Sequence, residues 1–269
     1  MSDRSVHPSA EVHPQAIVED GASIGEGCRI GPFCHVGAEV VLGPSCELKS
    51  HVAVAGDTHL GEACRIFPFA SIGHEPQDLK HAGEPVQLRI GARCTFREGV
   101  TVNPGTAGDR TVTTIGDDGV FLANAHVAHD CRVGDRVIFS NNVMLAGHCE
   151  VGDGVIMGGG AAVHQFTRIG ALSFVGGLAG VENDVIPFGM ALGNRAYLGG
   201  VNIVGMRRAG LDRTSVRAVR NAVQTLFSKD HPVKENLARI RDDDMTAEVE
   251  RIVAFVEAGG DRALCTPKA

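Results

Sequence analysis

Apolar residues return at every sixth position along most of the chain. Between residues 127 and 168 the segments VAHDCR, VGDRVI, FSNNVM, LAGHCE, VGDGVI, MGGGAA and VHQFTR each begin with an aliphatic or bulky apolar residue. The fifth place of each segment holds a small or β-branched residue. This repeat is typical of a parallel β-helix, in which short strands coil around a filled core. We therefore predict such a coil, with three six-residue units in each turn.

The same period covers the N-terminal part of the chain. Its apolar anchors are Val6, Val12, Val18, Ile24, Ile30, Val36, Leu42, Leu48, Val54, Leu60, Ile66 and Ile72. The pattern then breaks over residues 73–89 and again over 103–114, and it resumes at Ile115. We expect both interruptions to loop out of the coil. Ordered loops on a rigid scaffold often carry function.

The pattern changes to a helical period after about Tyr197. Asp212 is a candidate N-cap for an apolar stripe that includes Val216, Val219 and Val223, and Gly259 is a candidate C-cap for a later stripe. We predict a mainly β protein, with a hexapeptide-repeat β-helix domain over residues 1–195 and a small C-terminal α-helical domain over 196–269. The helices would close the end of the solenoid.

Composition supports this architecture and narrows the partners. The 269 residues include 35 Gly and no Trp, and the net charge of −7 argues against nucleic acid as a partner. Of the eight Cys, all but Cys265 occupy the small fifth place of a repeat, which indicates core packing and not metal ligands. No run of about 18 apolar residues is present. We therefore expect no membrane span and a reduced, cytoplasmic location.

Polar residues converge on one corner of the predicted coil. Residues eighteen apart should stack on neighbouring turns, which places His129, Gly147 and Gln165 in one column. His148 and His164 lie beside this column in the sequence, and His126 is three residues before His129. The convergence, and not the repeat itself, indicates a functional site.

Three chemistries fit these residue types. Zinc could be held by His126, His129 and His148, as in β-helical carbonic anhydrases. A nucleophilic cysteine is disfavoured, because Cys131 and Cys149 face the core, where a thiol is inert. General-base catalysis needs only His129 with Asp130 to orient it, and the N–H of Gly147 could hold an oxyanion. The histidines could also serve packing alone. We favour the general base and expect no metal.

Several longer motifs identify a family. The chain resembles the bacterial UDP-N-acetylglucosamine O-acyltransferases, left-handed β-helix enzymes that open lipid A biosynthesis. The resemblance covers nearly the whole chain and is carried by PQDLK with GEP, NAHVAHDC, NNVMLAGHCEVGD, AVHQF and GVNIVGMRR. It implies a left-handed coil, a homotrimer with active sites between subunits, and no cofactor beyond the acyl-carrier-protein thioester that serves as co-substrate.

The resemblance also assigns roles to residues. His129 would deprotonate the sugar 3-position, Asp130 would orient His129, and Gly147 would support the oxyanion. Gly177 would occupy the position that limits acyl-chain length. The UDP-sugar would be held by Gln77, Asp78, His126, His148, His164, Gln165, Asn202 and Arg208, and Lys80 would lie near its entry.

The helical segment is rich in arginine. Arg213, Arg217 and Arg220 belong to a basic cluster that is either a solvated helix face or a docking surface for the acidic carrier protein. The sequence departs from the family pattern at His81, Asn103, Pro104, Val204 and Ala209. These departures concern nucleotide contacts, and they leave open whether the acceptor is UDP-N-acetylglucosamine or its 3-amino analogue.

Overall fold

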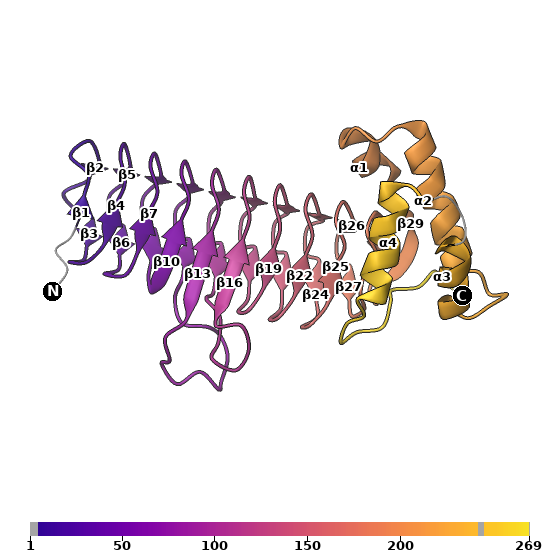
Figure 1. Ribbon diagram of the computed structural model, residues 1–269. Coiled ribbons are helices and arrows are strands. Elements are labelled where there is room, and N and C mark those ends of the chain that lie inside the picture. Colours follow the sequence, from indigo (N-terminus) through magenta and orange to yellow (C-terminus); the bar gives the residue numbers. More distant parts are fainter. Residues whose placement is uncertain (1–4, 242–244, 269) are drawn as a thin grey trace.

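The chain forms a three-sided prism of short parallel strands with helices at its C-terminal end (Figure 1). The computed structural model describes residues 5–241 and 245–268. Each turn of the coil adds one strand to each of three sheets. Where no insertion intervenes, a residue pairs with the one eighteen positions away, as His126 does with Met144. This register confirms the predicted three repeats per turn.

The three faces of the prism are numbered here as sheets 1 to 3. Sheet 1 consists of β1 (Ser5–Val6), β4 (Ser23–Ile24), β7 (Val41–Leu42), β10 (Asp57–Leu60), β13 (Gln87–Ile90), β16 (Val112–Ile115), β19 (Arg132–Val133), β22 (Glu150–Val151) and β25 (Arg168–Ile169). Sheet 2 consists of β2 (Glu11–Val12), β5 (Arg29–Ile30), β8 (Glu47–Leu48), β11 (Arg65–Ile66), β14 (Thr95–Phe96), β17 (Val120–Phe121), β20 (Ile138–Phe139), β23 (Ile156–Met157), β26 (Phe174–Val175), β28 (Gly189–Leu192) and the antiparallel β29 (Tyr197–Val201). Sheet 3 consists of β3 (Ile17–Val18), β6 (His35–Val36), β9 (Ala53–Val54), β12 (Ser71–Ile72), β15 (Thr101–Val102), β18 (His126–Val127), β21 (Met144–Leu145), β24 (Ala162–Val163) and β27 (Gly180–Val181).

The core is a column of anchor residues inside the prism. In a two-residue strand the side chains point to opposite faces, so the anchor faces inward and its neighbour faces outward. Val127 and Leu145 are fully buried, for example, while Met144 is about half exposed. All eight cysteines are buried and unpaired. Burial raises the pKa of the Cys131 thiol, which agrees with its predicted role as a core filler.

The edge between sheets 3 and 1 carries the polar residues singled out by the sequence. We call its residues 128–131, 146–149 and 164–167 the histidine edge. One residue in each of its turns has a left-handed backbone, with φ of 59° at Asp130 and 63° at both His148 and Phe166. Their Cα atoms therefore follow one another along the edge at a fixed point of each turn.

Both interruptions of the repeat leave the coil at this same edge. The first loop, residues 73–86, joins β12 to β13, and the second loop, residues 103–111, joins β15 to β16. The two loops hang together from the coil (Figure 1) and are linked by the Asn103 side-chain amide, which donates to the carbonyls of His74 and Glu75 at 3.2 Å each. The predicted loops are thus confirmed, and they lie next to the histidine edge.

Four helices follow the coil: α1 (Ile203–Arg208), α2 (Arg213–Leu226), α3 (Val233–Arg241) and α4 (Ala247–Glu257). Asp212 caps α2 as predicted, by accepting from Ser215 N, and α2 packs against α3, α4 and β29. In the part of the chain that the structure describes, no helix is both long and apolar enough to cross a membrane. The division into domains at 195/196 stays a prediction.

The C-terminal tail returns from the helices to the coil. Asp184 N–H donates to the carbonyl of Ala263, and Cys265 N–H donates to the carbonyl of Asp184. The buried Asp184 carboxylate also pairs with Arg168 of β25 at 2.7 Å. These contacts hold the tail against the C-terminal turns of the coil, beside the histidine edge.

Candidate active site

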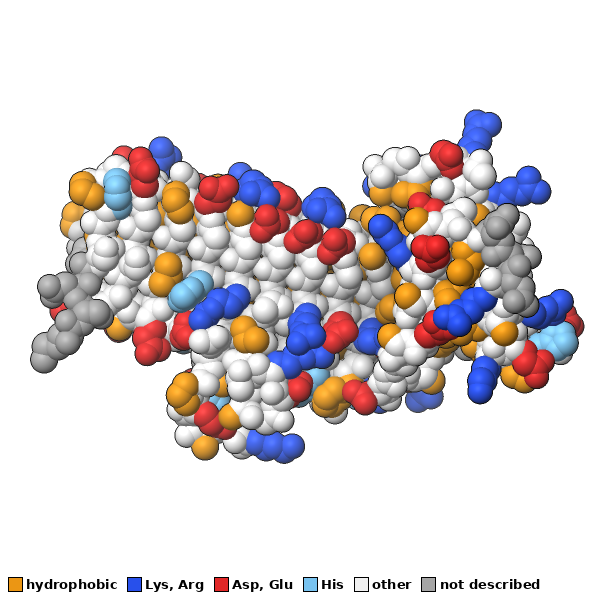
Figure 2. Space-filling model, viewed as in Figure 1, with side chains coloured by type: hydrophobic (Ala, Val, Ile, Leu, Met, Phe, Trp, Pro, Cys, Tyr) orange, Lys and Arg blue, Asp and Glu red, His pale blue; other side chains and the backbone are white. Residues whose placement is uncertain are grey.

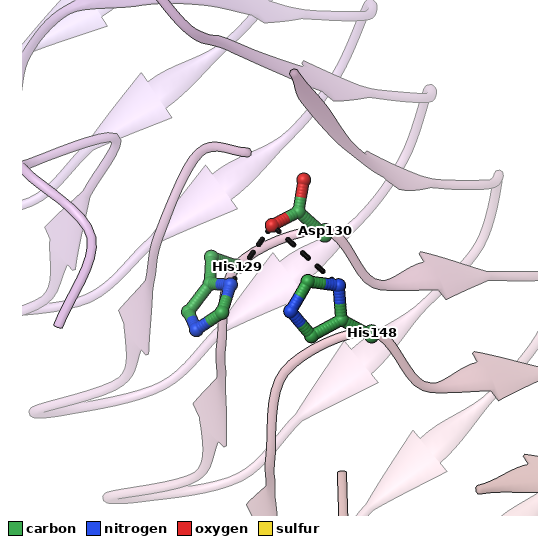
Figure 3. Close-up of side chains that lie close together, drawn as sticks. All are labelled: His129, Asp130 and His148. Carbon is green, nitrogen blue, oxygen red and sulfur yellow. Dashed lines mark hydrogen bonds and ion pairs between the residues drawn. The ribbon is translucent and has the colours of Figure 1, made fainter. Parts of the chain in front are cut away.

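The centre of the histidine edge is a hydrogen-bonded pair of adjacent residues. His129 Nδ1 lies 2.9 Å from Asp130 Oδ2 (Figure 3). The left-handed backbone of Asp130 turns its side chain back toward the ring of the preceding residue. Because Nδ1 is held by the carboxylate, the Nε2 atom of His129 is left as the proton acceptor. This is the arrangement expected of an oriented general base.

The second loop buries the Asp130 carboxylate. Thr106 donates its backbone N–H and its hydroxyl to this carboxylate at 3.0 and 2.6 Å, and Arg110 donates its N–H at 3.2 Å. Burial favours the neutral acid, but the hydrogen bonds from His129 and Thr106 outweigh it and lower the pKa of Asp130 to about 2. Asp130 is therefore a carboxylate at neutral pH, able to stabilise an imidazolium at His129.

His148 stands beside this pair on the next turn of the coil. Its Nδ1 lies 2.6 Å from Asp109 Oδ2 and 3.8 Å from Asp130 Oδ2. Its ring stacks on Phe166 at 4.4 Å and meets the His129 ring edge-on at 4.9 Å. Figure 3 shows both imidazoles turned toward the Asp130 carboxylate. Two of the three histidines of the edge are thus each paired with a carboxylate.

Gly147 lies directly against the His129 ring. A Cβ atom at position 147 would come within 2.6 Å of His129 Cε1 and 2.8 Å of its Nε2, so only glycine leaves room for this ring position. The Gly147 N–H donates no hydrogen bond to any described residue. An unsatisfied N–H next to the base is well suited to hold an oxyanion.

The remaining histidines flank the centre. His126 faces outward from β18, with Nδ1 2.7 Å from Thr101 Oγ1, and burial, assisted by His129, lowers its pKa. His164 and Gln165 occupy the following turn, where Arg262 of the C-terminal tail contacts both. His148 N–H donates to the His129 carbonyl and Phe166 N–H to the Gly147 carbonyl, so the stacking predicted for His129, Gly147 and Gln165 on successive turns is present.

Four residues of this site were absent from the sequence prediction: Thr106, Asp109, Arg110 and Arg262. The first three lie in the second loop. The break in the repeat at this loop was the one feature of the sequence that pointed to them. Arg262 lies 98 residues from His164 in the sequence. Nothing in the repeat indicates that the tail returns to this edge.

Other predicted substrate residues lie apart from this centre. Gln77, Asp78 and Lys80 lie in the first loop, and no hydrogen bond or ion pair between described residues joins them to His129, Asp130 or His148. The Asn202 side chain makes hydrogen bonds within the fold. It caps α1 by accepting from Gly205 N, and it donates to the carbonyl of Leu172. Arg208 is exposed in the last turn of α1.

Gly177 lies at the edge between sheets 2 and 3, across sheet 3 from the histidine edge. It is exposed, and a Cβ atom there would approach the carbonyl oxygen of Gly159 at 3.3 Å. Within one subunit, Gly177 and His129 are therefore on different edges of the prism.

The departures from the family pattern fall into two groups. Asn103, Pro104 and His81 lie where the first loop meets the coil, and Pro104 and His81 line a groove of about 970 Å³ there. Val204 and Ala209 lie in α1 and at its C-cap, where Val204 is well exposed. Among the described residues, no hydrogen bond or ion pair joins a departing residue to the side chain of His129 or Asp130.

The predicted docking arginines form one surface. Arg213, Arg217 and Arg220 are exposed on α2, and together with Arg207 they line a hollow of about 410 Å³. Among the described residues, no acidic side chain forms an ion pair with these four arginines. Figure 2 shows Lys and Arg side chains projecting from this helical end of the molecule.

Among the described residues, the side chains that could together hold a metal ion differ from the predicted set. The possible ligand atoms of His129, Asp130 and His148 lie within 4.8 Å of one another, whereas His126 is not part of this group. The Asp130 oxygens already accept three hydrogen bonds from Thr106 and Arg110. The donor set therefore fits a hydrogen-bonded acid–base cluster better than the three-histidine zinc site.

Comparison with known proteins identifies the family. A domain model described as Udp N-acetylglucosamine O-acyltransferase, Domain 2, matches residues 184–265, and a model of six bacterial transferase hexapeptide repeats matches residues 21–56. Acyl-acyl-carrier-protein–UDP-N-acetylglucosamine O-acyltransferases of Rhizobium etli and Methylobacterium radiotolerans are 55% identical over 194 residues and 59% identical over 199 residues. The first alignment covers 72% of this chain and 71% of the relative; the second covers 72% of each.

A solved structure extends the likeness to the whole chain. The UDP-N-acetylglucosamine acyltransferase from Campylobacter jejuni superposes with a TM-score of 0.90 at 32% identity, over 96% of this chain and all (100%) of that one. This likeness confirms the predicted left-handed β-helix with a small helical part. The chain is an acyltransferase and belongs to the UDP-N-acetylglucosamine O-acyltransferase family.

Proposed function

We propose that this protein transfers a 3-hydroxyacyl or related acyl chain from acyl carrier protein to the 3-hydroxyl of UDP-N-acetylglucosamine, the first step of lipid A biosynthesis, with His129 as the general base. One observation carries the assignment of the base. In a chain of this family, His129 is held by the buried carboxylate of Asp130 and its ring lies against Gly147, whose N–H donates to no described residue.

These positions support the following reaction. His129 Nε2 removes the proton from the sugar hydroxyl as that oxygen attacks the thioester carbonyl. The new C–O bond makes a tetrahedral oxyanion, which accepts a hydrogen bond from Gly147 N–H. Collapse breaks the C–S bond, and the departing thiolate of the carrier takes the proton from the imidazolium. Asp130 stabilises that imidazolium throughout.

The nucleotide sugar would lie along the histidine edge and under the first loop. His148, His164 and Gln165 lie on this edge and His126 lies next to it on β18, and Gln77, Asp78 and Lys80 would approach it from the loop. Arg208 would contact the nucleotide from α1. Asn202 would act indirectly, by fixing the start of the helix that carries Arg208. Gly177 would adjoin the acyl chain.

A homotrimer would bring these parts together. Exposed apolar side chains gather on sheet 3 and on its edge with sheet 2: Ile17, Phe33, Phe69, Met144 and Leu178 are each more than half exposed. Phe33 and Phe69 both pack against His51, in a ladder of side chains eighteen residues apart. Covering this face by a second copy would remove apolar surface from water and place the histidine edge beside the subunit junction.

The carrier protein would dock on the helical end. Arg213, Arg217 and Arg220 present three charges that no described acidic residue neutralises, which suits an acidic partner. A cytoplasmic location agrees with eight unpaired, buried cysteines and stays a prediction.

The test is a matched set of assays on the purified protein. Acyl-carrier thioesters of increasing chain length should transfer to UDP-N-acetylglucosamine and form an ester at the 3-position. The 3-amino analogue should react poorly. If the acyl group were transferred preferentially to the amine, the acceptor would be the 3-amino sugar instead. Metal analysis should find no stoichiometric zinc, and a chelator should leave the rate unchanged. Carbon dioxide hydration that is lost with zinc removal would overturn the acyltransferase assignment.

A further inference from the structure

Two histidines beside His129 are bound by partners of opposite chemical character. His148 faces the carboxylate of Asp109, with a Nδ1–Oδ2 distance of 2.6 Å. His164 faces the guanidinium of Arg262, with a Nδ1–Nη2 distance of 2.6 Å. In each ring the partner engages Nδ1 and leaves Nε2 available. Since one partner can only accept and the other can only donate, the two rings cannot be in the same protonation pattern.

At His148, the carboxylate requires a proton on Nδ1. The Nδ1–H points at Asp109 and, more distantly at 3.8 Å, at Asp130. The stack of the ring on Phe166 at 4.4 Å keeps its plane in place. In the neutral ring the proton therefore resides on Nδ1, and Nε2 presents a lone pair that accepts hydrogen bonds.

At His164, the guanidinium requires a lone pair on Nδ1. An arginine side chain has no acceptor, so a contact of 2.6 Å must run from Nη2–H to the ring nitrogen. The Gln165 carbonyl also lies 3.2 Å from this Nδ1, which alone would call for a proton there, but that carbonyl already accepts from Arg262 Nε at 3.1 Å. The shorter contact decides the tautomer. His164 Nε2 then carries the proton and donates.

Both partners sit on segments whose positions are fixed. Asp109 belongs to the second loop, whose neighbour Arg110 pairs with Glu150 of β22 at 2.6 Å. Arg262 belongs to the tail, which is tied to the coil by backbone hydrogen bonds on both sides of Asp184. Asp109 and the residues just before Arg262 line a single hollow of about 370 Å³ with His148.

We propose that Asp109 and Arg262 are positioning residues that fix opposite tautomers, so that His148 Nε2 accepts a hydrogen bond from the UDP-sugar and His164 Nε2–H donates one to it. The roles of His148 and His164 in binding the sugar rest on the proposed function. An acceptor at His148 suits a hydroxyl or amide N–H of the ligand. A donor at His164 suits a carbonyl, hydroxyl or phosphate oxygen. Neither residue touches the reacting atoms.

The direct test is the tautomer of each ring in the unaltered protein. Multiple-bond ¹H–¹⁵N correlation spectra of histidine-labelled enzyme, taken where both rings are neutral, should show the proton on Nδ1 of His148 and on Nε2 of His164. The same tautomer in both rings would overturn the proposal. This measurement needs neither a variant nor catalytic activity.

Alanine variants then test the consequence for the sugar. Asp109→Ala should remove the Nδ1–H preference of His148, and Arg262→Ala should remove the Nε2–H preference of His164. Each should raise KM for UDP-N-acetylglucosamine about tenfold, as expected for one hydrogen bond to a charged partner, with kcat nearly unchanged. Asp109→Asn and Arg262→Lys keep an acceptor and a donor, and should restore most of the affinity.

Asp20→Ala and Arg251→Ala are matched controls, since each removes one charge of the same sign from an exposed side chain outside the site. Unaltered tautomers or an unchanged KM in the alanine variants would overturn the positioning role. The enzyme could show the expected tautomers and bind UDP-N-acetylglucosamine in calorimetry, yet transfer no acyl group. That result would support the positioning role and refute the proposed reaction.

Discussion

The N-terminal and central turns of the coil share one backbone design and differ sharply at the same edge. Glu39 and Asp130 occupy the same place in their repeats, three residues after the anchors Val36 and Val127. Glu39 is exposed, whereas Asp130 is fully buried. The second loop makes the difference, because Thr106 covers the Asp130 carboxylate and hydrogen-bonds to it. The repeat supplies a regular edge, and the interruption of the repeat turns one part of that edge into a site.

The largest effect is expected when one imidazole is removed from each of the two regions and the activities of the variants are compared. His129→Ala should lower kcat by about 10²-fold or more, because it removes the general base. His13→Ala, at an exposed N-terminal corner, should leave kcat unchanged. Steady-state acyl transfer measures both, and circular dichroism checks that the coil is intact. Equal effects of the two changes would erase the distinction between the regions.

A smaller effect is expected from changing the space beside the base. Gly147→Ala would put a methyl group within 2.6 Å of the His129 ring and displace it, which should cost about 10²-fold in kcat or somewhat less. Gly37→Ala, on an N-terminal turn of the same edge, meets its nearest atom at 3.4 Å and should be nearly silent. A fully active Gly147→Ala enzyme would contradict the assigned position of the base.

The docking surface should respond to charge and salt. Replacing Arg217 and Arg220 by Glu should raise KM for the acylated carrier protein about tenfold at low ionic strength. The difference should shrink as salt rises, because exposed charges are screened. Arg239→Glu on α3 is the control, since its side chain is exposed on another helix. A KM that is independent of salt in all variants would remove this surface from the account.

The smallest effect concerns stability in acid. The pKa of Asp130 is depressed to about 2 in the folded protein, below the value of about 3.9 expected when unfolded. Its contribution is therefore present above pH 4 and is lost as the pH falls from about 4 to about 2, with a magnitude on the order of 2 kcal/mol. Denaturant melts across this range should show a shallower pH dependence for Asp130→Asn than for the unaltered protein. Parallel curves would show that the carboxylate is not held as described.

Most of the fold was accessible from the sequence because its period is strict. Each anchor must face inward, so the position of every repeat follows from the one before it, and the Asp212 cap and the helical stripe of α2 follow from local patterns. The stacking of His129 with Gly147 and Gln165 was predictable for the same reason. These features depend on residues that are close in sequence or related by a fixed spacing.

The rest of the site depends on segments that break the period. Thr106, Asp109 and Arg110 reach the edge because the second loop folds back on the coil, and Arg262 does so because the tail pairs with Asp184. No local sequence pattern predicts that the second loop or the tail packs against the histidine edge. Asn202, which the family resemblance placed at the substrate, is used to cap α1 and tie it to the coil. A motif can thus assign a residue to the region of a site without showing which of its hydrogen-bonding atoms are already used within the fold.

The most direct test of the account is a double-mutant cycle on the pair at the histidine edge. Single-turnover acyl transfer would be measured for His129→Ala, Asp130→Asn and the double variant; Asn tolerates the left-handed backbone at position 130. If Asp130 acts only through His129, the double variant should be no slower than His129→Ala alone. Losses that multiply would contradict a single base formed by these two residues.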